Sequence, residues 1–290
     1  MPRTEANGIE LEYETFGDPR QPTLLLVAGL GSQLLSWRSG LCAHFAAHGF
    51  HVVRYDNRDS GLSTFLDRGP KPDLRAIVRG DPGSAPYLIA DLARDAVGLL
   101  DALGVDRAHV AGASMGGMIA QQLAIDHPGR LRSLCSIMSR PGDGVSGAGT
   151  REAEAQLSTP RPADRAGAIE AGMGVWRVIG SPGYPEDEAG LRAHVAETYD
   201  RSHRVDGFGR QLAAILASPD RTAGLRGVTA PTLVLHGMAD PLIDRSGGEA
   251  TARAVPGAEL LLLPGMGHDL PEPLWPDIAD AVAANAAQAS

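Results

Sequence analysis

Short apolar runs alternate along this chain with longer amphipathic stretches. Runs that are rich in Val and Leu and bounded by Gly or Pro are typical of strands buried on both faces of a parallel sheet. Between them, apolar residues recur at three- and four-residue spacing, which predicts helices that bury one face. The predicted strands are Thr23–Ala28, His51–Tyr55, Ala108–Ala111, Leu131–Met138, Thr232–His236 and Glu259–Leu263, and the predicted helices are Leu34–His48, Tyr87–Leu103, Met115–His127, Ser246–Ala254 and Pro273–Ala287.

The alternation of strand and helix predicts an α/β fold, with a mostly parallel sheet, right-handed crossovers and flanking helices. Gly8–Phe16 alternates in the way expected of an antiparallel edge strand. Between about Ser139 and Arg221 the pattern breaks, because Gly, Pro, Arg and acidic residues dominate there. We therefore expect a core formed by residues 1–138 and 222–290, and a helical lid at 139–221 with helices at Ala163–Ile179, Glu186–Arg201 and Gly207–Ala217.

Aromatic residues are few in this chain, and the predicted lid contains a large share of them, namely Trp176, Tyr184, Tyr199 and Phe208. Such a distribution is expected of a lid that covers an apolar pocket, because aromatic side chains line most small-molecule sites. We expect Trp176 and Tyr184 to contact the substrate. Each of these aromatics could equally serve only to pack the lid on the core.

Composition and charge exclude several classes of function. The chain has 290 residues, of which 43% are hydrophobic, so it can bury a substantial core. Its formal net charge of -9 argues against a nucleic-acid partner, because phosphate contacts need clustered Lys and Arg. No stretch approaches the roughly 20 apolar residues of a membrane span, and Met1 to Asn7 are polar without a secretory pattern. We expect a cytoplasmic protein without a membrane partner; the sequence leaves its oligomeric state open.

A glycine-rich turn joins one predicted strand to the helix that follows it. The run Gly112-Ala113-Ser114-Met115-Gly116-Gly117 comes directly after the strand Ala108–Ala111. A G-x-S-x-G run between a strand and a helix is typical of a nucleophile elbow, whose small residues make room for a sharp turn. A dinucleotide-binding turn would need Gly at position 114. The turn therefore predicts Ser114 as a catalytic nucleophile.

A serine nucleophile needs a base, and the base needs an acid that orients it. Asp240 follows the predicted strand Thr232–His236, and His268 follows the last predicted strand. The carboxyl ends of parallel strands meet at one edge of the sheet, and the order Ser, acid, His is that of elbow-bearing hydrolases. We predict a Ser114–His268–Asp240 triad.

Other residues are weaker candidates for these roles. Asp244 is the rival acid, whereas Asp143 is the first carboxylate after another strand and Asp269 would have to turn back sharply to reach His268. His194 and His203 lie in the predicted lid and are candidates for substrate contact. Cys42 and Cys135 show no metal-ligand spacing, so we expect buried thiols and no metal site.

Acyl transfer also needs two N–H groups that stabilise a negatively charged oxygen. The residue after the nucleophile, Met115, supplies one of them. The second is expected in the loop after the strand Thr23–Ala28, where we choose Leu30, with Gly29 beside the substrate. A simple glycine turn between strand and helix would account for the same residues.

With these residues placed, the chain resembles the α/β-hydrolase superfamily over nearly its whole length. Within it, the run Arg54-Tyr55-Asp56-Asn57-Arg58-Asp59-Ser60-Gly61-Leu62-Ser63 and the run Pro264-Gly265-Met266-Gly267-His268 resemble the small lid-bearing esterases related to aclacinomycin methylesterase. The resemblance implies hydrolysis of a carboxylic ester without metal or cofactor, and a loop-fixing role for Asp56 and Arg58. Ala28 departs from the His-Gly that opens the oxyanion loop in many members, which predicts altered packing there.

We therefore expect a serine esterase that acts on a small, largely apolar ester through an acyl-enzyme. Lactone opening, thioester hydrolysis, carbon–carbon bond hydrolysis, proline iminopeptidase activity and perhydrolysis remain open, because all can use the same triad. A ligand receptor with slow turnover is the alternative of a different class. Serine at the elbow argues against dehalogenase and epoxide-hydrolase chemistry, which needs a carboxylate there.

Overall fold

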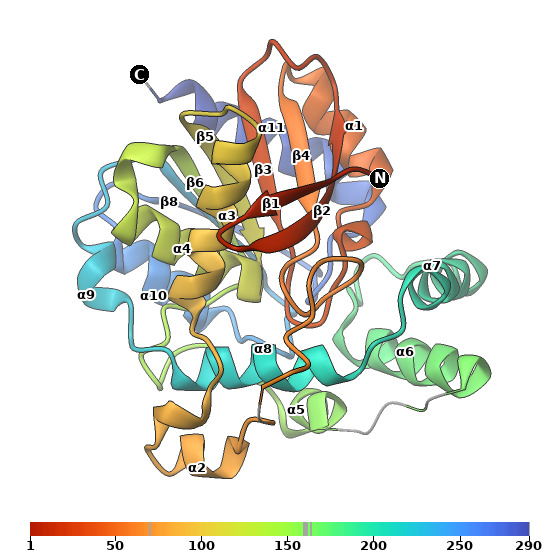
Figure 1. Cartoon of the computed structure of the whole chain (residues 1–290). Coiled ribbons are helices and arrows are strands. Elements are labelled where there is room, and N and C mark those ends of the chain that lie inside the picture. The colour runs from red at the N-terminus through yellow and green to blue at the C-terminus, as the bar shows by residue number, and fades with distance from the viewer. Residues whose placement is uncertain (70, 159–161, 163, 290) are drawn as a thin grey trace.

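The computed structural model describes residues 1–69, 71–158, 162 and 164–289. Its centre is an eight-stranded sheet with the order β1-β2-β4-β3-β5-β6-β7-β8 (Figure 1). β1 and β2 pair antiparallel, as do β2 and β4, and the remaining neighbours are parallel. The strands are β1 Arg3–Ala6, β2 Ile9–Phe16, β3 Thr23–Val27, β4 His51–Tyr55, β5 Ala108–Ala113, β6 Leu131–Ile137, β7 Thr232–Gly237 and β8 Glu259–Leu263.

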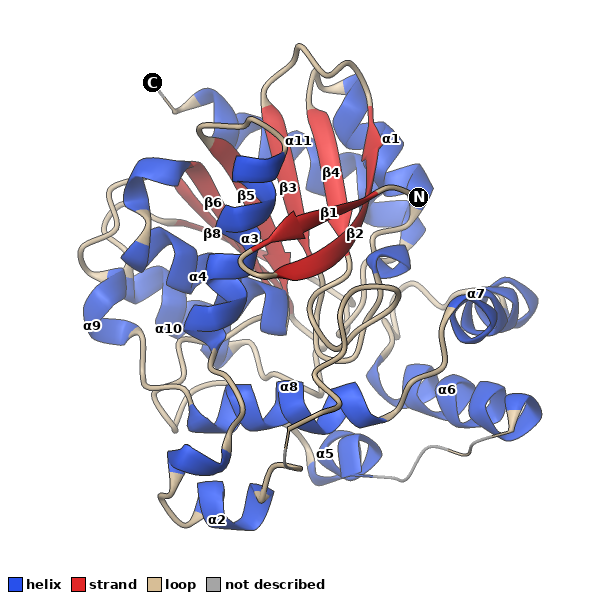
Figure 2. Cartoon of the chain, viewed as in Figure 1, coloured by secondary structure: helices blue, strands red, loops and turns tan. Residues whose placement is uncertain are grey.

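Helices cover both faces of this sheet (Figure 2). One face packs on α1 (Ser39–Ala47) and α11 (Trp275–Ala287). The other packs on α3 (Ile89–Ala102), α4 (Met115–Asp126) and α10 (Ser246–Ala254). The central strand β3 is buried on both sides, because Leu25 and Val27 join one core cluster while Leu24 and Leu26 join the other. The predicted α/β architecture is confirmed.

Four helices form a layer outside this sandwich, along the lower edge of the sheet in Figure 1. We call α5 (Arg151–Ser158), α6 (Arg165–Ile179), α7 (Glu188–Arg201) and α8 (Asp206–Ala217) the cap. Asp164 and Asp187 accept backbone N–H groups at the starts of α6 and α7, which satisfies donors that have no partner within a helix. The predicted start of α6 at Ala163 lies outside the described residues.

Some elements differ from the sequence-based expectation. The helix expected over Leu34–His48 is interrupted: a 3₁₀ turn over Leu34–Ser36 is followed by Trp37 and Arg38 in non-helical conformations before α1 begins. Apolar spacing continues across this break, so periodicity does not reveal it. β1, α5 and the short helices α2 (Leu74–Val78) and α9 (Thr222–Leu225) were not predicted. No helix within the described ranges is long and apolar enough to cross a bilayer.

Candidate active site

Ser114 lies at the turn between β5 and α4, with φ 58° and ψ −120°. This left-handed conformation is strained for a residue with a side chain, and such strain gathers at functional sites. The turn is possible only because its neighbours are small. A Cβ on Gly112 would lie 2.0 Å from the Gly116 carbonyl oxygen, and a Cβ on Gly116 would lie 2.0 Å from that of Val27. The two glycines thus allow α4 to start directly behind Ser114.

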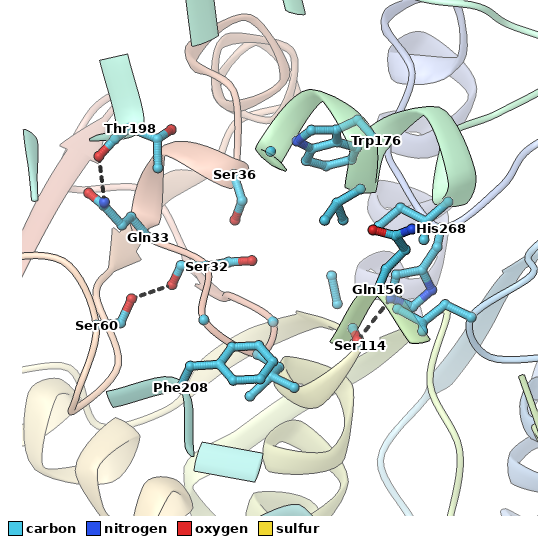
Figure 3. Close-up of a pocket in the computed structure, with 18 of the residues that line it drawn as sticks. Ser32, Gln33, Ser36, Ser60, Ser114, Gln156, Trp176, Thr198, Phe208 and His268 are labelled. Atoms are coloured by element: carbon cyan, nitrogen blue, oxygen red, sulfur yellow. Dashed lines mark hydrogen bonds between the residues drawn. The ribbon is translucent and has the colours of Figure 1, made fainter. Parts of the chain in front are cut away.

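The structure brings Ser114, His268 and Asp240 into one hydrogen-bonded chain. The Nε2 atom of His268 lies 3.0 Å from Ser114 Oγ (Figure 3), and its Nδ1 lies 2.7 Å from Asp240 Oδ2. Asp240 follows β7 and His268 follows β8, so adjacent parallel strands deliver both side chains to the same edge of the sheet. This arrangement allows a base to take a proton from the hydroxyl while an acid holds the base.

The Asp240 carboxylate is held in a single orientation. Its Oδ1 accepts the backbone N–H groups of Leu242 and Ile243, each at 2.9 Å. Its Oδ2 faces His268 and lies 3.4 Å from Nε2 of the buried His236. Burial alone would raise the pKa of Asp240, but the charge of His268 and the hydrogen bonds to His236 and His268 outweigh burial and hold the pKa well below its usual range. The group is therefore a carboxylate at neutral pH.

The rival acids have other partners. Asp269 accepts a hydrogen bond from Ser181, and burial raises its pKa. Asp244 accepts the N–H of Ser246 at 3.0 Å. Asp143 caps its own loop by accepting the N–H groups of residues 145 and 146. Only Asp240, among the described carboxylates, makes a hydrogen bond to His268.

The two predicted oxyanion donors flank Ser114. Met115 is the buried first residue of α4, whose N-terminal end favours negative charge. Leu30 lies in the loop after β3, and a Cβ on its neighbour Gly29 would come within 3.3 Å of Ser114 Cβ. Among the described residues, neither the N–H of Leu30 nor that of Met115 has a hydrogen-bond acceptor. Both donors are therefore available to a bound group.

A cavity of about 560 Å³ opens over Ser114 and His268, between the sheet edge and the cap (Figure 3). Gly29, Leu30 and Trp176 line it, as expected from the sequence. Tyr184 is not among its described lining residues: it packs on the core beside Gly265, so the structure gives it a packing role. The cavity is also lined by His194 and His203 and by the lid aromatics Tyr199 and Phe208. Further lining residues were not predicted, including Ser32, Ser36, Gln156 and Thr198.

Burial lowers the pKa of His194 to about 4, with the charges of Arg38 and Arg54 acting in the same direction. This histidine is neutral at physiological pH. The cavity wall therefore carries hydroxyl, amide and neutral imidazole groups among apolar side chains, together with ionisable residues such as Arg140, Arg204 and Asp269. Ser36, Gln156 and Thr198 were missed because an isolated polar residue gives no sequence signal of the cavity that it faces.

Comparison with known proteins agrees with this fold. A family model described as alpha/beta hydrolase fold matches residues 22–159. Rhodomycin D methylesterase DauP of Streptomyces sp. (strain C5) is 30% identical, over 96% of this chain and 95% of that protein. A putative carbamate hydrolase, RutD, of Variovorax paradoxus is 29% identical over 89% of each chain. The solved esterase RhEst1 of Rhodococcus sp. ECU1013 shares the fold, with a TM-score of 0.76, 21% identity and full coverage of both chains.

Proposed function

We propose that this chain, which belongs to the α/β-hydrolase family and is a carboxylic ester hydrolase, works through an acyl-enzyme formed on Ser114. The observation that carries the proposal is the hydrogen-bonded chain from Asp240 through His268 to Ser114 Oγ. This order of partners is what a weak hydroxyl nucleophile needs for activation.

In the first half of the reaction, His268 Nε2 takes the proton of Ser114 as Oγ attacks the ester carbonyl. The N–H groups of Leu30 and Met115 stabilise the oxyanion of the tetrahedral intermediate, each contributing about 10²- to 10³-fold in rate. His268 then gives its proton to the leaving alcohol. In the second half, His268 activates a water that releases the acid and regenerates Ser114.

Asp240 determines which nitrogen of His268 carries a proton in the resting enzyme. Its ionised Oδ2 accepts Nδ1–H, which leaves Nε2 free as a base. The same carboxylate stabilises the imidazolium that forms during attack. Because Asp240 is buried and held by two backbone N–H groups, it does not reorganise during the reaction.

The cavity supports a small, largely apolar substrate. Trp176, Met118, Met138 and Leu270 line it together with Phe208, and about 560 Å³ is the size of an ordinary small-molecule site. Residues of the cap helices form part of the wall of this cavity above Ser114. We propose that substrate selection lies in this cap-lined space.

A panel of p-nitrophenyl esters of increasing acyl length tests the activity, together with Ser114→Ala and a fluorophosphonate probe. We expect many turnovers per protein, fastest with one chain length, and labelling at Ser114 alone. Ser114→Ala should lose both turnover and labelling. Labelling of that variant at another residue would overturn the assignment, and fewer than one turnover per protein would indicate a receptor. Faster cleavage of lactones or thioesters than of every linear ester would show that the enzyme acts mainly on a different type of bond.

A further inference from the structure

We propose that Gln211, a residue of cap helix α8, is a positioning residue that holds the oxyanion loop in its working conformation. The oxyanion loop is defined here as residues 28–32, between β3 and the 3₁₀ turn at Leu34–Ser36. The inference rests on the proposed function, because that function assigns the Leu30 N–H to the oxyanion. It adds a residue from a distant part of the chain to the groups that make this loop effective.

The Gln211 side chain is fully buried and bonded at both ends of its amide. The backbone N–H of Gly31 donates to its Oε1 at 2.7 Å, and its Nε2–H donates to the Arg58 carbonyl oxygen at 2.8 Å. The Gly31 donor requires an oxygen and the Arg58 acceptor requires an N–H, so only one orientation of the amide satisfies both. Gln211 thus joins the oxyanion loop to the segment after β4.

These bonds act on the orientation of the Leu30 N–H. Gly31 N–H belongs to the peptide group that directly follows Leu30, so Gln211 restrains the backbone rotation on that side. On the other side, Asn57 Nδ2 donates to the Ala28 carbonyl oxygen at 3.0 Å. The peptide group that carries the Leu30 N–H lies between these two restraints. An oxyanion donor is effective only when it already points at the developing charge.

Phe208, one turn earlier in α8, adds a steric restraint. A Cβ on Gly31 would lie 2.7 Å from its ring, and Gly31 has a positive φ of 65°. The loop therefore passes tightly under α8 in a conformation that suits glycine. Both contacts come from the cap, about 180 residues further along the chain, so the cap completes the oxyanion site as well as covering it.

Arg210 provides a matched comparison, since it lies on the same helix and its side chain reaches the same core segment after β4. Its guanidinium pairs with the buried Asp59 at 2.6 Å. No described contact joins its side chain to the oxyanion loop. Loss of Arg210 loosens the docking of α8, whereas loss of Gln211 releases the loop itself, and the two effects can be separated.

The test compares Gln211→Met, Gln211→Asn and Arg210→Met with the parent enzyme, using the fastest p-nitrophenyl ester. For Gln211→Met we expect kcat to fall about 10- to 100-fold while KM changes less than about twofold, because misdirected donors weaken only the transition state. Affinity for a trifluoromethyl ketone, which forms a tetrahedral adduct on the serine, should fall in parallel with kcat/KM. Arg210→Met should melt at a lower temperature but keep kcat within about threefold, because the donors stay aligned.

Gln211→Asn is a second variant, for the case in which the Gln211→Met protein does not fold. Its amide is one methylene too short to bond both partners, so kcat should also fall. A kcat within about twofold of the parent in either Gln211 variant, or an equal loss in Arg210→Met, would overturn the inference. Undiminished turnover in Ser114→Ala would instead overturn the proposed function, so the two failures are distinguishable.

Discussion

The hydroxyl of Ser181, in the connection between α6 and α7, accepts the backbone N–H of Gly267 at 2.8 Å. It also donates to Asp269, so it bonds the residues on both sides of His268. The N–H of His268 itself donates to the Ile179 carbonyl oxygen at 2.7 Å. The loop that carries the proposed base is therefore held by the cap.

Ser181→Ala removes the acceptor of the Gly267 N–H and the hydroxyl that donates to Asp269. We expect kcat to fall about tenfold, because a small displacement of His268 lengthens its bond to Ser114. The control is Ser218→Ala: Ser218 also accepts a backbone N–H, that of Ile89 at 2.9 Å, but lies away from the site. It should lose similar thermal stability and keep its kcat. Equal kcat values for the two variants would contradict the role of Ser181.

Asp240→Asn should lower kcat by about 10³- to 10⁴-fold without unfolding the protein. The Leu242 and Ile243 N–H groups require an oxygen at the Oδ1 position, so the new amide must turn its NH₂ toward His268. His268 then accepts at Nδ1 and carries its proton on Nε2, where it cannot take the proton of Ser114. Steady-state kinetics and circular dichroism check this outcome. Asp244→Asn is the control and should keep its activity. Loss of activity in Asp244→Asn but not in Asp240→Asn would assign the role of the triad acid to Asp244.

Gly29→Ala should slow turnover about tenfold, because its Cβ would lie 3.3 Å from Ser114 Cβ and 3.4 Å from the Ala113 carbonyl oxygen. That contact pushes the nucleophile and the oxyanion loop apart. Gly209→Ala, on α8, is the matched variant, since no atom lies within 4 Å of the added Cβ. It should retain kcat and gain about 0.5–1 kcal/mol of stability from helix propensity. A Gly29→Ala enzyme as fast as the parent would show that this crowding is relieved without cost.

His194 should make the protein less stable in mild acid. Its pKa in the folded protein is about 4, below the usual histidine pKa of 6.5, so between these values the unfolded chain binds a proton that the folded protein does not. Stability present at neutral pH is thus lost as the pH falls from about 6.5 to about 4. His194→Gln removes this dependence and should lose less stability between pH 7 and pH 5, by at most about 2 kcal/mol. Urea unfolding at both pH values measures the difference; identical losses would show that His194 does not contribute.

The sequence by itself determined the elements whose stability is local or patterned. The continuous apolar run of β3 specifies a strand that is buried on both faces. The three- and four-residue spacing of apolar residues in α4 specifies a helix that packs through one face. The turn at Ser114 is equally local, since its glycines are adjacent in the chain. Asp240 and His268 could be placed because parallel strands bring their carboxyl ends to one edge, whatever the details of packing.

The tertiary structure alone decided which cap residues contact the oxyanion loop and the loop that carries His268. Gln211 with Gly31 and Ser181 with Gly267 are contacts between segments about 180 and 86 residues apart, and no periodicity encodes which polar side chain meets which backbone group. The same holds for Tyr184, because an aromatic side chain can line a pocket or pack in a core. In the structure the connection between α6 and α7 places this side chain against the core. Hydrogen bonds are directional and short, so their partners are fixed only once the cap has packed on the sheet edge.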